Sequence, residues 1–230
     1  VYYMATNGGM MVKLTVDDVG NMTSYSRVDP SGADMSNYLF INPFTMDLAN
    51  NDIIYMPEGP FLWRNNALST LPLFDPSFNV FVPTNVGWSK FSADVEGEGL
   101  IITALGTSKA NPAHRLYIGT NTRRVYRFDD AHEGDPEMVE VTGSNFPGSG
   151  GYASCIAVDP RDADKVFVVF SNYELYSLYY SEDGGTSWVT AAGNLEENNN
   201  GSGGGPSLRW LSVLPVDGSV DSTAYFLGTS

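Results

Sequence analysis

The sequence has very few of the residues on which several common classes of protein depend. Cys155 is the only cysteine, so no internal disulfide can form, and the apolar run around it indicates a core side chain rather than a nucleophile. His114 and His132 are the only histidines, too few and too isolated for a zinc site or a catalytic triad. The densest acidic run, residues 129–137, does not match the spacing of a calcium-binding loop. We therefore predict no metal site and no cofactor.

Basic residues are also scarce. Lysine and arginine number 12 against 27 acidic residues, which gives a formal net charge of −15. This charge opposes binding to nucleic acid or to an anionic membrane. The sequence has no apolar run of 18 residues and no basic-then-apolar leader, so we expect no direct membrane insertion. With 42% hydrophobic and 13% aromatic residues, the chain has enough apolar side chains to build a packed core.

Helical periodicity is absent, and a repeated pattern of short β-prone runs stands in its place. An apolar run ends in Asn-Pro, Asp-Pro or Leu-Pro, and a second run with an aromatic residue follows it. If that aromatic residue marks the second strand of each repeat, the marked residues should occupy equivalent positions on the second strands of successive sheets. The markers recur at intervals of about 50 to 60 residues, as in repeat proteins with one small sheet per repeat; they are Tyr3, Tyr55, Tyr117, Phe167 and Tyr225.

This period is typical of a β-propeller, whose blades each contain four antiparallel strands. A β-sandwich would show frequent turns but no such long period. We therefore predict an all-β fold, a single β-propeller segment over residues 1–230, with about four blade periods of a larger ring and further domains in a longer chain. The expected parts are a partial blade at 1–31, blades at 37–91, 99–142 and 152–192, and the start of another blade at 207–230.

One turn carries a more specific motif. The stretch Ser181-Glu182-Asp183-Gly184-Gly185-Thr186-Ser187-Trp188 fits the pattern Ser-x-Asp-x-Gly-x-(Ser/Thr)-Trp. Asp183 can accept hydrogen bonds from its own turn, the glycines allow positive φ, and Trp188 can anchor the outgoing strand. On these residues the chain resembles the BNR/Asp-box propellers, which include sialidases, xyloglucan-cleaving glycosidases and sortilin-type receptors. It is most similar in kind to degenerate propellers of large bacterial secreted surface proteins that use the type IX secretion route.

The resemblance implies where a ligand would bind. In such propellers the Asp-box turn lies opposite the usual ligand face, so Ser181, Asp183, Gly185 and Trp188 are expected to be structural. Ligands contact the loops around the central channel instead. The candidate residues there are aromatic, acidic and basic side chains suited to a carbohydrate or protein partner: Asp34, Glu58, Glu98, Arg124, Tyr173, Arg209 and Trp210.

An enzymatic function would need more than these candidates supply. A glycosidase needs two carboxylates about 5 to 9.5 Å apart, and Glu58 with Glu98 is the least implausible pair, although nothing in the sequence fixes their separation. A sialidase needs three convergent arginines, whereas Arg123 and Arg124 are adjacent and would point to opposite faces of a strand. We therefore predict a non-catalytic, secreted or cell-surface scaffold or binding module. The alternative is a glycoside hydrolase of the Asp-box propeller type that acts on a polysaccharide or a sialoside.

Overall fold

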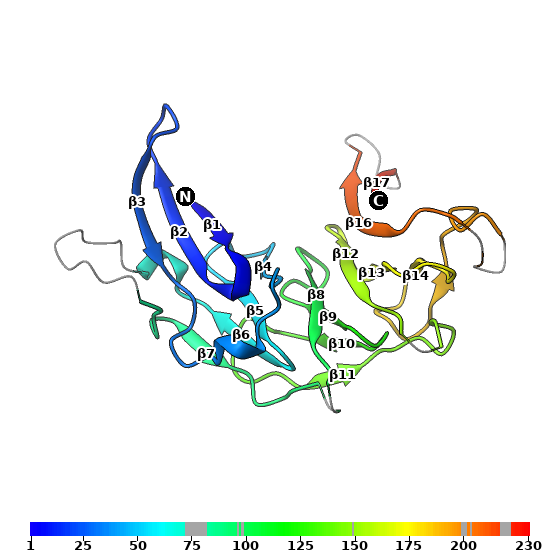
Figure 1. Ribbon diagram of the computed structural model, residues 1–230, viewed down its shortest axis with the longest axis horizontal. Coiled ribbons are helices and arrows are strands. Elements are labelled where there is room, and N and C mark those ends of the chain that lie inside the picture. Colours follow the sequence, from blue (N-terminus) through cyan, green and yellow to red (C-terminus); the bar gives the residue numbers. More distant parts are fainter. Residues whose placement is uncertain are drawn as a thin grey trace.

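The computed structural model describes residues 1–71, 82–95, 97, 99–148, 150–198, 202, 204–216 and 222–230. In this part of the chain, the strands form five antiparallel sheets that follow one another along an open arc (Figure 1). Helical structure among the described residues is limited to three short turns, η1 (Asn7–Gly9), η2 (Met35–Asn37) and η3 (Leu68–Thr70). None of the described helices has the length and apolar character needed to span a membrane.

Each sheet is a meander in which every strand pairs with the next one in the sequence. The first sheet contains β1 (Tyr2–Ala5), β2 (Met11–Val16) and β3 (Met22–Arg27). The second contains β4 (Thr45–Met46), β5 (Ile54–Glu58), β6 (Phe61–Asn65) and β7 (Trp88–Lys90), and the third contains β8 (Ile102–Thr107), β9 (Leu116–Thr120), β10 (Val125–Phe128) and β11 (Met138–Glu140). The fourth contains β12 (Ala153–Asp159), β13 (Asp162–Phe170), β14 (Leu178–Ser181) and β15 (Val189–Thr190), and the fifth contains β16 (Leu208–Pro215) and β17 (Thr223–Thr229). The prediction of four-stranded antiparallel propeller blades is confirmed.

The hydrophobic core lies between successive sheets, and the aromatic markers help to build it. Tyr55 on β5 packs with residues of β9, Tyr117 on β9 packs with residues of β13, and Phe167 on β13 packs with residues of β16. Tyr3 on β1 packs in the same way against the second sheet. These four residues therefore occupy equivalent positions, each on the side of its strand that faces the following sheet, as predicted.

The fifth marker lies on the expected strand but on the opposite face. Tyr225 pairs with Val213, and its ring centroid lies 5.1 Å from that of Phe167 in the preceding sheet. Since neighbouring residues of a strand point to opposite faces, Phe226 holds the position equivalent to Phe167. The sequence prediction for Tyr225 is thus wrong by one residue, because two aromatic residues stand side by side there.

The first proline repeat is also misplaced in the sequence prediction. Phe40 and Ile41 were expected in a strand that ends at Pro43, but both side chains are exposed, and β4 begins only at Thr45. Asp47 is the true counterpart of Asp159. The Oδ1 atom of Asp47 accepts a hydrogen bond from the amide of Ala49 at 2.8 Å, and Asp159 accepts one from Arg161 two residues on at the same distance, the pattern of an Asx turn.

Candidate functional site

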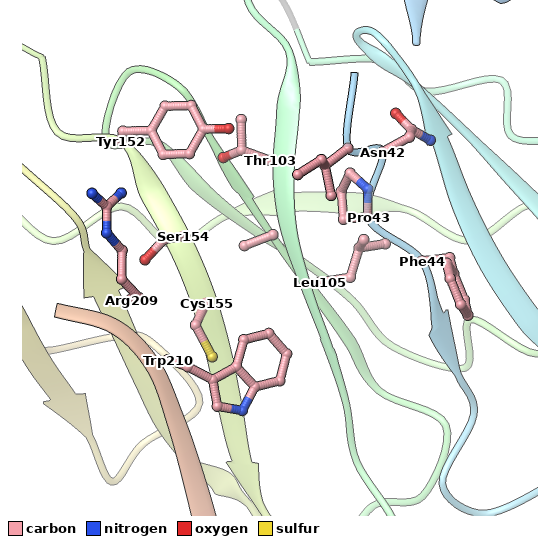
Figure 2. A pocket seen from close by; sticks show the side chains of 12 residues that line it. Asn42, Pro43, Phe44, Thr103, Leu105, Tyr152, Ser154, Cys155, Arg209 and Trp210 are labelled. Atoms are coloured by element: carbon pink, nitrogen blue, oxygen red, sulfur yellow. The ribbon is translucent and has the colours of Figure 1, made fainter. Parts of the chain in front are cut away.

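A pocket of about 600 Å³ lies among the first strands of successive sheets (Figure 2). Of these first strands, β12 contacts both β8 and β16, and the segment that precedes β4 completes the wall. Figure 2 shows Tyr152, Arg209, Ser154 and Thr103 toward one side of the pocket, and Phe44, Leu105 and Trp210 toward the other. The pocket therefore has a polar side and an apolar side. The lining residues are Ile41, Asn42, Pro43, Phe44, Thr103, Ala104, Leu105, Tyr152, Ser154, Cys155, Arg209 and Trp210.

The polar side is built from one position that is repeated in the second to fifth sheets. The pairing of β8, β12 and β16 with their neighbours is interrupted by a register shift, and Thr103, Ser154 and Arg209 each lie at that shift. A β-bulge leaves one residue out of the ladder and redirects its side chain. In the third and fourth sheets the bulged residue lies three residues before the one that pairs with Tyr117 or Phe167. Thr45 pairs with Tyr55 in the second sheet, so Asn42 holds the same position there. All four side chains line the pocket.

Three of these four polar side chains use their donors on the framework. Asn42 donates from Nδ2 to the carbonyl of Pro57 at 2.8 Å, and Thr103 donates from Oγ1 to the carbonyl of Ala153 at 2.6 Å. The Ser154 hydroxyl donates to the carbonyl of Val169 at 3.4 Å. Because Oδ1 of Asn42 also accepts from the amide of Leu39 at 3.1 Å, the acceptors left for a ligand are mainly the hydroxyl oxygens of Thr103 and Ser154.

Arg209 differs from these three residues. Its side chain is exposed in the pocket, and it has no ion pair or hydrogen bond within the part of the chain that the structure describes. Other arginines are held by carboxylates or carbonyls, as Arg115 is by Asp129 and Asp164. Arg209 therefore keeps its donors free.

The neighbouring Trp210 occupies the position that Ala104 and Cys155 hold in the two preceding sheets. Its indole is 59% exposed, and its Nε1 donates to the hydroxyl of Ser212 at 3.2 Å. It therefore contributes an aromatic surface to the apolar side of the pocket. Aromatic surfaces of this kind are common in ligand sites.

The pocket lining contains few ionisable side chains. Among the described residues that line it, none carries a carboxylate, and Arg209 is the only charged side chain. Cys155 also faces the pocket, but it is 2% exposed, and burial raises the pKa of its thiol to about 11. Because the thiolate is the nucleophilic form, this cysteine is unreactive at neutral pH and is a core side chain, as the sequence indicates.

Glu58, the strongest carboxylate candidate, lies outside this pocket and is held by neighbouring groups. It is 3% exposed and forms an ion pair with Lys90, with 3.2 Å between Oε2 and Nζ. Its Oε2 also accepts from Nε1 of Trp63 at 2.7 Å, and its Oε1 accepts from the amide of Asp34 at 2.9 Å. Burial raises the pKa of this carboxyl, but the donated hydrogen bonds and Lys90 outweigh burial and lower it overall. Both carboxylate oxygens of Glu58 are therefore bound by groups of the protein itself.

The remaining candidates are dispersed. Asp34 accepts from the amide and hydroxyl of Ser36 at the start of η2, and these bonds lower its pKa. Arg124 donates to the hydroxyl of Tyr126 at 3.2 Å, and Tyr173 is 61% exposed. Neither lines the pocket. Glu98 lies outside the described residues.

The two histidines are not isolated from each other, contrary to the sequence prediction. The rings of His114 and His132 stack with centroids 3.9 Å apart, and Nδ1 of His114 lies 3.0 Å from the buried carboxylate of Asp47. The sequence could not bring them together because they come from different loops of the third sheet. Within the described ranges, no group of three or more potential metal ligands is present.

The turn at residues 181–188 is held by side-chain hydrogen bonds to Asp183. Asp183 accepts from the amide of Ser187 at 2.8 Å and from its hydroxyl at 2.6 Å, and Ser181 donates to the same carboxylate at 2.8 Å. Gly185 adopts a φ of 91°, a conformation that favours glycine. The buried indole of Trp188 donates from Nε1 to the carbonyl of Val141 at 2.8 Å, which joins this turn to the preceding sheet.

We expect Asp183→Ala to lower the free energy of unfolding by about 1 to 3 kcal/mol, because several turn donors lose their acceptor. Ligand affinity should not change, since Asp183 is absent from the pocket lining. Urea unfolding and a binding titration of the same variant measure both quantities. Asp18→Ala, at an exposed aspartate in another turn, is the control. Loss of binding with unchanged stability would show that the ligand contacts the Asp183 turn and that we have assigned the ligand to the wrong face of the propeller.

Comparison with known proteins supports the β-propeller fold but assigns the chain to no family. No family model matches the chain, and no curated protein matches it. Among solved structures, the GH74 xyloglucanase of Xanthomonas campestris (Xcc1752) matches with a TM-score of 0.50 and 17% identity, over 90% of this chain and 31% of that chain. The β-propeller domain of Myceliophteria thermophila Cps50 (Swd1) matches with a TM-score of 0.54 and 12% identity, over 91% of this chain and 58% of that chain. The chain is therefore a β-propeller segment, and it spans less than two thirds of either structure.

Proposed function

We propose that this protein is a non-catalytic binding module of the secreted or cell-surface type, built on a propeller of the BNR/Asp-box kind, and that its ligand binds in the pocket among β8, β12 and β16. The pocket composition carries this proposal. A pocket of about 600 Å³ is within the size range of small-molecule sites, and its described lining has polar acceptors, one free guanidinium and no carboxylate. These groups suit recognition, whereas glycoside hydrolysis needs paired carboxyl groups.

Two further observations support binding without catalysis. Glu58 is committed to Lys90, Trp63 and Asp34, so it is not free to meet a substrate. The proteins similar in fold include both a xyloglucanase and a non-enzymatic propeller domain. The fold is therefore compatible with either role, and the pocket favours binding.

A substitution that fills the pocket tests the proposal. Ser154→Gln places a long neutral side chain at a position where the next sheet carries an arginine, so the strand should tolerate it. We expect the intact protein to bind at least one member of a panel of xyloglucan, β-glucan, galacturonate and sialoside oligomers, and Ser154→Gln to weaken that binding at least tenfold. Thr190→Gln on the outermost strand of the same sheet should leave it unchanged. Equal binding by both variants would contradict a ligand in this pocket.

A further inference from the structure

We infer that the ligand of this pocket is a sugar acid, an oligosaccharide unit that carries a carboxylate, and that Arg209 binds this carboxylate. The inference rests on the proposed function, because it names the chemical class that the same pocket would recognise. Its basis is the repeated polar position, where four sheets place four side chains into one pocket and only one of them keeps its donors free.

The charge of Arg209 is the first step. The protein carries a net charge of −15, and other arginines such as Arg27 and Arg115 bind a carboxylate of the protein itself. Within the described part of the chain, Arg209 has no such partner, and no described carboxylate lines the pocket around it. A guanidinium presents a planar fork of donors that matches a carboxylate. A carboxylate on the ligand would supply the complementary group.

The remaining polar groups define the rest of the ligand. Asn42, Thr103 and Ser154 donate to carbonyls of the framework. Oδ1 of Asn42 also accepts from the amide of Leu39 at 3.1 Å, so the acceptors left for a ligand are mainly the hydroxyl oxygens of Thr103 and Ser154. A ligand that satisfies these oxygens must bring donors of its own, and the hydroxyl groups of a sugar ring do so. An acidic peptide would bring a carboxylate as well, but its main-chain donors are usually satisfied along a strand edge rather than by side-chain oxygens in a pocket.

The apolar side of the pocket completes the match. Phe44, Leu105 and Trp210 lie opposite Arg209 and Tyr152 in Figure 2. A pyranose ring has an apolar face of C–H groups and a rim of hydroxyls, so it can contact both sides at once. A carboxylate at the edge of that ring would then reach Arg209. A uronic acid unit combines these three features.

Pairs of ligands that differ only in charge test the inference. We would titrate the intact protein with trigalacturonate, with a mannuronate trimer and with a hyaluronan tetrasaccharide, and with the methyl ester of each. We expect at least one acid to bind tenfold or more tightly than its ester, because a charge-assisted hydrogen bond contributes about 1.5 to 3 kcal/mol, or about 10- to 150-fold in affinity. Arg209→Gln should remove this preference. Lys109→Gln, which removes the same charge outside this pocket, should not.

The outcomes separate the inference from the proposed function. Binding of a neutral glycan that Ser154→Gln abolishes, with no preference for any acid, would overturn the inference and leave the pocket as a binding site. Acid binding that Arg209→Gln leaves intact, or binding of an acidic peptide with no binding of any uronide, would also overturn it. Failure of every probe, neutral and acidic, would count against the proposed function itself.

Discussion

Replacing Tyr117 by alanine is expected to lower the free energy of unfolding by about 4 kcal/mol, within the range for loss of a large buried side chain. Tyr117 is fully buried and packs between the third and fourth sheets with Val166 and Val168. Its hydroxyl donates to the carbonyl of Ala163 in the next sheet at 2.8 Å. The substitution leaves a cavity at this junction, and chemical denaturation of the intact protein measures its cost.

Two variants make this result specific. Tyr117→Phe keeps the ring and removes the hydroxyl, which donates to Ala163 and accepts from Nη1 of Arg115 at 3.4 Å, so it should cost about 1 kcal/mol. Tyr173→Ala removes an exposed tyrosine and should stay within about 0.5 kcal/mol of the unchanged protein. If Tyr117→Ala cost no more than Tyr173→Ala, the packing between sheets described above would be wrong.

Replacing Glu58 by alanine is expected to cost about 3 kcal/mol. The substitution removes the acceptor for Trp63, for the amide of Asp34 and for Lys90. Loss of one partner of a buried ion pair costs about 3 to 5 kcal/mol, and we expect the lower end because the Lys90 side chain is 34% exposed and can turn to water. Thermal or denaturant unfolding checks the value.

The pH dependence of this effect has a definite sign. The pKa of Glu58 is lowered in the folded protein, so its stabilising contribution is present above the unfolded pKa of about 4.3 and is lost as the pH falls through the folded pKa. Glu58→Gln should therefore be less stable than the unchanged protein at pH 7, and the difference should shrink as the pH falls below about 4.3. The control Glu137→Gln, at an exposed glutamate, should show little difference at either pH. A Glu58→Gln difference that grew at low pH would contradict the ionised, bonded state.

The sequence predicted the fold well because the strand pattern repeats. Tyr55, Tyr117 and Phe167 recur at blade spacing, and each packs toward the following sheet. The pattern failed where its markers were ambiguous. Tyr225 and Phe226 are both aromatic, and a shift of one residue reverses the face of a strand. At residues 40–43, the proline resembled the end of a strand although Asp47 forms the turn.

The candidate site was harder to predict, for a physical reason. Arg209 and Trp210 were identified as residues of a loop around the central channel, whereas both lie on β16. Thr103 and Ser154 were missed, since they reach the pocket through β-bulges, and a bulge depends on pairing between strands. The role of Glu58 was also hidden in the sequence, because Trp63 and Lys90 come from the two following strands of its own sheet. Aligning the first strands on Gly106 and Ala157, which pair with Tyr117 and Phe167, places Thr103 and Ser154 at the same position.

Hydrolysis by the intact protein is the most direct test of a binding role without catalysis. The protein would be incubated with sialosides and with β-glucan and xyloglucan oligomers, and the released sugars would be measured for the unchanged protein, Glu58→Gln and Glu98→Gln. We predict no turnover above the uncatalysed background in any of the three. Turnover by the unchanged protein that falls by about 100-fold or more in either variant, as expected when a general acid or base is removed, would contradict the binding role and identify a glycoside hydrolase.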